Sequence, residues 1–280
     1  MTTASGHRLA YLGPPGTFTE AAAIRYSPNA HHIPMASPFA IAKAVTSHMA
    51  DEGIVAIENA LEGAVPDTLD LLIHDSDLSI REEVILPIVQ CLLVKPGTTI
   101  EQVDVIYSHP NALGQCRAFL DRCFPKAHAT AALSTAAAVE EALRDPRSAA
   151  IGNLRAAELY GAEVLAESIQ DSPNNETRFI VLAQEDHPPT GDDKTSVCFT
   201  FKEDKPGILV SVLQCFSSRG INLARIESRP SKESLGRYFF LADLHGHRLD
   251  LPVKDALEET AALSDRQRFK ILGSYPRFRG

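Results

Sequence analysis

The chain has 280 residues, 44% apolar and 22% charged, a composition typical of a globular protein with two or three compact units. Its formal net charge of −9 argues against a nucleic-acid-binding protein, which would need a basic face for phosphate contacts. No apolar run approaches the roughly 20 residues that span a bilayer, and residues 1–7 lack the apolar stretch of a signal peptide. The five cysteines form no C-x-x-C pair, so we expect a reduced, cytoplasmic protein.

From residue 8 to residue 184, short apolar runs alternate with helical patterns. The predicted strands are 8–12, 53–57, 103–107, 149–151 and 179–182, and the predicted helices are 19–26, 40–49, 67–74, 112–123 and 136–143. This alternation predicts parallel strands with helices on both faces of a sheet. The extended segment 79–94 is predicted to cross between two units. We therefore expect two α/β lobes, split near residue 80, with a cleft between them.

The pattern changes after residues 185–193, a charged segment rich in proline that is predicted to be a linker. The following region, 194–275, predicts strands at 195–201, 222–227, 238–243 and 269–275, with helices at 206–218 and 251–263. The order βαββαβ is typical of a ferredoxin-like fold. The sequence thus predicts a second, smaller domain.

Ligands of open α/β sheets bind beyond the carboxyl ends of the strands, and the first such segment here is 13–20. Gly16 would let the backbone approach a ligand closely, and Thr17 with Glu20 has the spacing of a capping box. The N–H groups of the helix that follows would suit a carboxylate, although an ordinary capped helix fits equally well. The segment matches neither a phosphate loop nor a dinucleotide-binding fingerprint.

Three further segments stand at predicted strand ends. Glu58 and Asn59 are candidate substrate contacts, although Glu58 could instead cap nearby backbone donors. A hydroxyl at 134–135 is expected to cap a helix. The polar loop 171–179 ends in Thr177, a hydroxyl donor, and Arg178, whose guanidinium offers a fork of donors to a carboxylate.

Several of these segments resemble the prephenate dehydratase family, in the same order and spacing. The matching stretches are YLGPPGTFTEAA (11–22), IENALEGAVPDTLDLL (57–72), STAAAV (134–139), IGNLRAAELYG (151–161) and NNETRF (174–179), and KPGILVSVL (205–213) with INLARIESRP (221–230) resembles an ACT domain. The resemblance implies a two-lobed catalytic region like periplasmic-type binding folds at 8–184, a linker at 185–193 and an ACT domain at 194–275. The sequence departs from the family pattern at Ala60, where serine is common, at Gln90, where histidine is frequent, and at Ile208, where alanine is usual.

The resemblance implies that prephenate is converted to phenylpyruvate, carbon dioxide and water, with feedback regulation by L-phenylalanine. Aromatisation of the ring drives this reaction, so no redox cofactor and no metal are expected; the histidine pairs at 31–32 and 245–247 also lack metal-ligand spacing. The expected partners are the substrate, the effector and further copies of the chain in a dimer or tetramer, with no nucleic acid and no membrane. The alternatives are an arogenate dehydratase and a non-catalytic, two-lobed amino-acid-sensing module.

The site residues follow from the motifs and the resemblance together. The expected catalytic residues are Thr177, Arg178 and Glu58, with Thr177 matching the family's essential threonine, and with Glu58 or Glu62 as a rival acid. The expected substrate-binding residues are Gly16, Thr17, Thr19, Asn59, Ser134, Thr135, Ala136, Asn175 and Phe179. The effector is expected between subunits, at Gly207, Ile208, Leu209, Val210, Asn222, Glu227, Ser228, Arg229 and Pro230.

Overall fold

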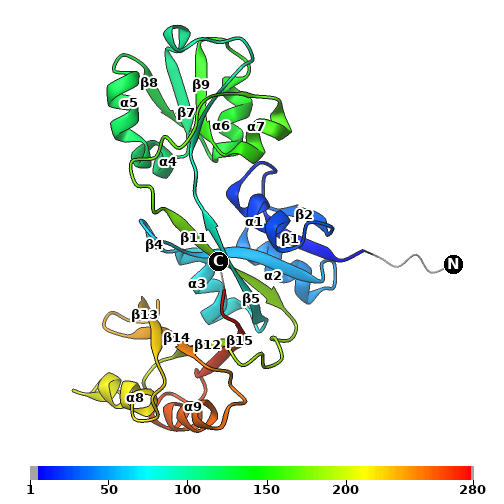
Figure 1. Cartoon of the computed structure of the whole chain (residues 1–280). Coiled ribbons are helices and arrows are strands. Elements are labelled where there is room, and N and C mark those ends of the chain that lie inside the picture. The colour runs from blue at the N-terminus through cyan, green and yellow to red at the C-terminus, as the bar shows by residue number, and fades with distance from the viewer. Residues whose placement is uncertain (1–5, 279–280) are drawn as a thin grey trace, which may run out of the picture.

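The computed structural model describes residues 6–278, which form three sheets, each with its own helices (Figure 1). Two lobes stand one above the other, and a smaller C-terminal domain packs beneath the first lobe. The two α/β lobes and the βαββαβ order of the C-terminal domain are as the sequence predicts.

The first lobe is built on the sheet β2-β1-β3-β11-β5, with the short strand β4 paired to β3. Its elements are β1 (Arg8–Leu12), α1 (Phe18–Tyr26), β2 (His31–Met35), α2 (Pro38–Thr46), β3 (Glu52–Asn59), β4 (Gly63–Ala64), α3 (Pro66–Asp70) with a π-helical turn (Leu71–Asp75), β5 (Ser79–Pro87) and β11 (Glu176–Ala183). Strand β1 is parallel to β2 and β3, whereas β11 is antiparallel to both β3 and β5. The first lobe is therefore completed by a strand that returns from the second.

The second lobe has the sheet β10-β6-β9-β7-β8. Its elements are β6 (Cys91–Val94), a 3₁₀ turn (Ile100–Gln102), β7 (Val105–Ser108), α4 (Pro110–Gln115), α5 (Arg117–Cys123), β8 (His128–Ala131), α6 (Thr135–Ala142), β9 (Ser148–Gly152), α7 (Leu154–Tyr160) and β10 (Glu163–Ala166). The central strand β9 is buried along its whole length, because helices cover both of its faces.

The C-terminal domain has the antiparallel sheet β13-β14-β12-β15. Its elements are β12 (Asp193–Phe199), α8 (Ile208–Ser217), β13 (Leu223–Pro230), β14 (Tyr238–His245), α9 (Leu251–Leu263) and β15 (Lys270–Pro276). One face of the sheet packs on α8 and α9. Residues of the other face, among them Cys198, Leu241 and Leu272, join the apolar core of the first lobe with Ile80.

The close approach of β15 to β5 requires a glycine. Gly273 has φ +141°, and a Cβ at this position would overlap the backbone of Ile80. The C-terminal sheet therefore lies directly against the edge of the first lobe, and the two share one continuous core.

Some elements differ from those that the sequence indicates. Strands β2, β8 and β10 carry weak apolar patterns, because all three are edge strands, and all four residues of β8 are exposed. The helix predicted at 112–123 is broken at Cys116 into α4 and α5. Within the extended segment 79–94 the chain leaves the first sheet after Pro87 and enters the second at Cys91, beyond the split expected near residue 80. Across residues 6–278, every helix is too short or too polar to cross a bilayer.

Candidate active site

A cleft of about 620 Å³ lies between the two lobes. The first lobe contributes the end of β1, the start of α1, the end of β3, the start of β11 and the β4–α3 segment. The second lobe contributes the starts of α4 and α6. The polar side chains that line the cleft belong to Thr17, Thr19, Asn59, Glu62, Gln90, His109, Asn111, Gln115, Ser134, Thr135 and Thr177.

Helices α1 and α6 are two of the helices that begin at this cleft. Thr17 caps α1 by accepting a hydrogen bond from the Glu20 backbone N–H (3.3 Å), and Ser134 caps α6 by accepting one from Ala137 N–H (3.0 Å). The first N–H groups of a helix have no partner within it, and they carry the positive end of the helix dipole. Within residues 6–278 neither Lys nor Arg lines the cleft. Negative charge in this cleft would therefore be bound by helix N-termini and neutral donors.

Thr177 and Asn59 stand opposite one another where β11 pairs with β3. Asn59 Oδ1 accepts hydrogen bonds from the backbone N–H groups of Leu61 (2.9 Å) and Glu62 (3.0 Å), which fixes the orientation of the amide. Asn59 Nδ2 then donates to Thr177 Oγ1 at 2.9 Å. Because this hydroxyl oxygen already accepts a hydrogen bond, its own proton remains available for donation into the cleft.

A chain of amide side chains extends from this pair to the second lobe. Asn59 Nδ2 also donates to Asn175 Oδ1 (2.8 Å), and Asn175 Nδ2 donates to Gln115 Oε1 (3.0 Å). Gln90 Nε2 donates to the same Gln115 oxygen (3.3 Å), and Gln115 Nε2 donates to Glu62 Oε1 (3.3 Å). The amides thus set the position of α4 against the end of β3 and the start of β11.

Ionisable side chains are few in the cleft. Glu62 and His109 are the ones that line it among residues 6–278. In the same part of the chain no group of three His, Cys, Asp or Glu side chains is arranged to hold a metal ion. The chemistry available to this arrangement is hydrogen bonding, dipole stabilisation and proton transfer.

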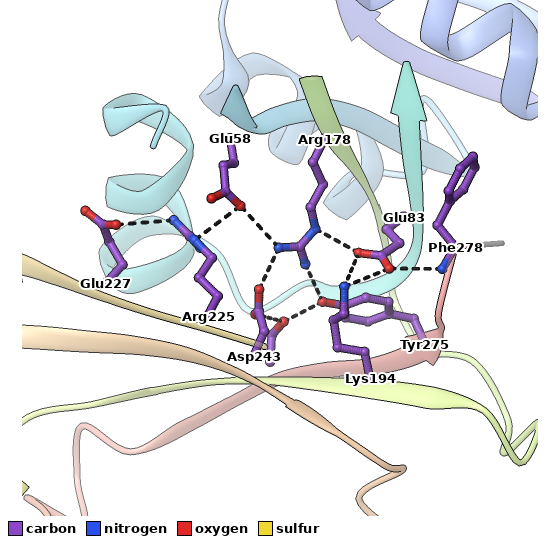
Figure 2. A network of polar contacts seen from close by, with 10 residues as sticks. Glu58, Glu83, Arg178, Lys194, Arg225, Glu227, Asp243, Tyr275 and Phe278 are labelled. Carbon is purple, nitrogen blue, oxygen red and sulfur yellow. Dashed lines mark hydrogen bonds and ion pairs between the residues drawn. The ribbon is translucent and has the colours of Figure 1, made fainter. Parts of the chain in front are cut away.

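Arg178 and Glu58 lie outside the cleft, which corrects their expected role as catalytic or substrate-binding residues. Arg178 is directed at the C-terminal sheet, where it donates to Glu83 Oε2 (2.7 Å), Asp243 Oδ2 (2.6 Å) and the Tyr275 hydroxyl (2.7 Å) (Figure 2). Glu58 lies beside it, with 3.7 Å between Glu58 Oε2 and Arg178 Nη1. The physical reason is the alternation of a strand, which points neighbouring side chains to opposite faces of the sheet.

The charges around Arg178 stabilise one another. Burial alone would lower the pKa of Arg178, but Tyr275, Asp243 and Glu83 raise that pKa well above its ordinary value. Burial would likewise raise the pKa of Asp243, yet Arg178 and a hydrogen bond from Ser196 hold it below its ordinary value. Lys194 Nζ lies 2.8 Å from both oxygens of Glu83 and completes the network.

Some of the other expected substrate residues line the cleft, and some lie behind its wall. Those that line it together with Thr177 are Thr17, Thr19, Asn59, Ser134, Thr135 and Phe179. Gly16, with φ +84°, lies behind it and donates its N–H to Glu20 Oε2 (2.7 Å). Ala136 is fully buried in the first turn of α6, and Asn175 acts through its bonds to Asn59 and Gln115. These three positions support the cleft from behind.

An ion pair joins the two lobes, and nothing in the sequence alone indicates it. Arg155 of α7 donates from Nε to Glu20 Oε2 of α1 at 3.2 Å, and Tyr160 of α7 donates from its hydroxyl to the Pro15 carbonyl at 2.9 Å. Both α7 residues belong to the stretch IGNLRAAELYG at 151–161. His109, Asn111 and Gln115 were also missed, although they directly follow the strand predicted at 103–107 and so had the position of ligand-binding residues.

The expected effector residues lie in two places. Gly207, Ile208, Leu209 and Val210 line a hollow of about 780 Å³ at the start of α8. The second set lies on β13, an edge strand of the C-terminal sheet, and consists of Glu227, Ser228, Arg229 and Pro230. Asn222 directly precedes β13. On β13, Glu227 lies 3.8 Å from Arg225, and Arg229 pairs with Asp70 of α3 (3.1 Å).

Comparisons with known proteins agree with this arrangement of domains. A family model described as prephenate dehydratase matches residues 9–187, and one described as ACT domain matches residues 201–262. The chain is 43% identical over 272 residues to a bifunctional chorismate mutase/prephenate dehydratase of Aquifex aeolicus, covering 96% of this chain and 74% of that protein.

Two solved structures are similar over nearly the whole chain. A prephenate dehydratase of Arthrobacter aurescens in complex with L-Phe has a TM-score of 0.89 and 41% identity, covering 96% of this chain and 90% of that one. A structure described as GqqA, a novel type of quorum quenching acylase, has a TM-score of 0.87 and 30% identity, covering 97% and 98%.

Proposed function

This chain belongs to the prephenate dehydratase family, and from that premise we propose that its interlobe cleft converts prephenate to phenylpyruvate, carbon dioxide and water. The observation that carries the proposal is the hydroxyl of Thr177, which lines the cleft and accepts a hydrogen bond from Asn59. Thr177 also matches the family's essential threonine. The activity requires a group that donates to a leaving hydroxyl, and this hydroxyl is oriented to donate.

The reaction needs a bound dianion and an assisted leaving group. The bond between the ring carbon and its carboxylate breaks to release carbon dioxide, its electron pair completes the aromatic ring, and the ring hydroxyl leaves with a proton as water. We propose that the N-termini of α1 and α6 bind the carboxylates, with Thr19 and Thr135 as neutral donors. Holding both carboxylates fixes the ring against Thr177, which is catalysis by positioning.

The proton that leaves in water needs an ultimate source. A threonine hydroxyl is a weak acid, so Thr177 polarises and orients the leaving hydroxyl or relays a proton to it. Of the two carboxyls considered as a rival acid, Glu62 lines the cleft and Glu58 does not. Glu62→Gln should therefore change the pH dependence of kcat if Glu62 supplies the proton, and should leave that dependence unaltered if it does not.

Regulation by L-phenylalanine belongs to the same proposal. We assign it to the ACT domain, since a relative of 41% identity is described in complex with L-Phe. We also propose that the chain forms a cytoplasmic dimer or tetramer and that the effector lies between two copies. The exposed apolar side chains Val210 and Ile226, near the two sets of expected effector residues, would be covered by such an arrangement. Light scattering on the purified chain measures the oligomer directly.

The test is a direct assay of the purified full-length chain. Incubation with prephenate should yield phenylpyruvate, detected by its ultraviolet absorbance, and added L-phenylalanine should inhibit the reaction. Arogenate run in parallel, compared by kcat/KM, separates a prephenate dehydratase from an arogenate dehydratase. A shared fold can host different activities, and one similar structure is described as a quorum quenching acylase. An N-acylated substrate is therefore assayed as well. Binding of L-phenylalanine with no turnover of prephenate or arogenate would instead favour the non-catalytic sensing module.

A further inference from the structure

The pairing of β3 with β11 gives one ladder with two functional faces. Asn59 pairs with Thr177, and the preceding Glu58 pairs with the following Arg178. Side chains alternate along a strand, so the first pair faces the cleft and the second faces the ACT domain. The proposed catalytic hydroxyl and the guanidinium buried against the ACT sheet therefore belong to adjacent residues of one strand.

The ACT sheet holds this guanidinium from two strands. Arg178 donates to Asp243 of β14 at 2.6 Å and to Tyr275 of β15 at 2.7 Å, while its Nε donates to Glu83 of β5 at 2.7 Å (Figure 2). The side chain is only 10% exposed. A planar guanidinium with three separately placed acceptors has a single favourable position. Any shift of the ACT sheet relative to the first lobe is consequently imposed on β11.

A second arginine extends the network to the edge strand of the ACT domain. Arg225 of β13 lies between two carboxylates, with its Nε 3.4 Å from Glu58 Oε2 and its Nη2 3.8 Å from Glu227 Oε2. Within the described residues its Nη2 is buried and makes no hydrogen bond. A continuous series of charges thus runs from β13 to β11 through Glu227, Arg225, Glu58 and Arg178 (Figure 2). Within this series Arg225 has N–H donors that make no hydrogen bond among the described residues.

We propose that Arg178 is a positioning residue for Thr177, and that Arg225 couples Arg178 to the effector strand of the ACT domain. The proposal rests on the proposed function, because it assumes that L-phenylalanine contacts β13 near Glu227. An effector that changes the Arg225–Glu227 contact also changes the position of Arg225 relative to Glu58. A movement of Glu58 and Arg178 then displaces their neighbours in β3 and β11, Asn59 and Thr177, which face the cleft. The effector acts by favouring one arrangement of this series over another.

The test separates effector binding from its effect on turnover. In the full-length chain, kcat and KM for prephenate are measured without and with saturating L-phenylalanine, and saturation is established by calorimetry. In Arg225→Gln we expect uninhibited kcat within about twofold of the parent, whereas the inhibition factor at saturation falls at least about fivefold. The matched control is Lys270→Gln, because Lys270 also joins the ACT sheet to the first lobe, at Ser76 and Asp77, but outside the series. The control should be inhibited like the parent.

A second variant tests the positioning role itself. Arg178→Lys keeps the charge but cannot bond three separate acceptors, so we expect kcat to fall about tenfold with KM within about twofold. This variant also remains informative if Arg225→Gln does not fold. A purely structural role would lower the folded fraction, measured by circular dichroism, and leave kcat per folded chain unchanged.

Three results would overturn the proposal. They are full inhibition of Arg225→Gln at saturating L-phenylalanine, loss of effector binding in that variant, which would make Arg225 part of the binding site, and a normal kcat per folded chain in Arg178→Lys. Failure of the proposed function is recognised separately, because the parent chain would then lack dehydratase activity or its response to L-phenylalanine before any variant is made.

Discussion

The first lobe meets the second lobe and the ACT domain in two very different ways. The lobes face each other across a cleft lined by hydroxyls, amides and helix N-termini, with few ionisable side chains. The ACT sheet instead shares an apolar core with the first lobe and encloses Arg178, Glu83 and Asp243 in a buried charge network. Neutral donors let a charged ligand enter and leave, whereas buried ion pairs and a common core resist separation.

The shared core makes the ACT domain a structural part of the first lobe as well as a regulatory domain. If the ACT domain were only an attached sensor, deletion of the chain beyond about residue 193 would leave activity and remove sensitivity to phenylalanine. The structure shows that such a deletion would expose part of the core and leave Arg178 and Glu83 without Asp243, Tyr275 and Lys194. Point substitutions on either face of β11 are therefore a better test of how the two contacts of the first lobe differ.

The largest effect on stability is expected at Arg178. Arg178→Met leaves the buried carboxylates of Glu83 and Asp243 without their shared partner, and breaking a buried pair in this way costs about 3–5 kcal/mol. Urea denaturation measures the change. The control Arg147→Met removes an arginine whose side chain is 69% exposed, and should change stability by less than about 0.5 kcal/mol. Similar losses in the two variants would contradict the buried network.

The shared core predicts that the ACT domain and the first lobe unfold together. Leu272→Ala removes a buried side chain of β15 that packs into the first-lobe core, and should destabilise the protein by about 2–4 kcal/mol. Scanning calorimetry should show one transition for these two parts, moved to lower temperature. A separate ACT transition that moves while the first-lobe transition stays unchanged would contradict the shared core.

On the cleft face the expected effect is on turnover. Asn59→Asp keeps an oxygen for the N–H groups of Leu61 and Glu62 but removes the donor to Thr177. We expect kcat to fall at least about tenfold, the value of one hydrogen bond, with a small change in melting temperature. The exposed Asn29→Asp serves as the control. A normal kcat in Asn59→Asp would show that Thr177 does not need this donor.

The smallest effect is a dependence of stability on acid pH. The pKa of Asp243 is below its ordinary value in the folded chain, because Arg178 and Ser196 outweigh the effect of burial. Its contribution to stability is therefore complete above the unfolded pKa of about 3.9 and is lost as the pH falls towards the folded pKa. Asp243→Asn should melt lower at pH 7 but decline less steeply below about pH 5 than the parent. Parallel curves of melting temperature against pH would remove Asp243 from the network.

Much of the fold could be predicted from the sequence. Helix α9 has the predicted bounds, and Thr17 and Ser134 cap helices at the cleft, because local patterns and caps determine such features. Strands β2 and β8 were missed, since edge strands with exposed side chains lack an apolar pattern. The Glu20–Arg155 pair joins residues 135 positions apart, and a single sequence gives no sign of it.

The error at Arg178 has a simple physical origin. The apolar run predicts a strand only from residue 179, which leaves Thr177 and Arg178 in a loop, where both could face one ligand. The structure begins β11 at Glu176, and adjacent residues of a strand point to opposite faces. What the sequence could not indicate is which of the two faces borders the cleft, because both faces of β11 are covered. One face packs against α1 beside the cleft, and the other belongs to the core shared with the ACT sheet.

The hydroxyl of Thr177 is the centre of the account, and its removal in a nearly isosteric variant is the most direct test. Thr177→Val, assayed with prephenate as the full-length chain, should lose at least about 100-fold in kcat with KM changed less than about threefold, while Thr177→Ser should keep most of the activity. Turnover by Thr177→Val close to that of the parent would contradict the assignment of the cleft face of β11 as the catalytic centre.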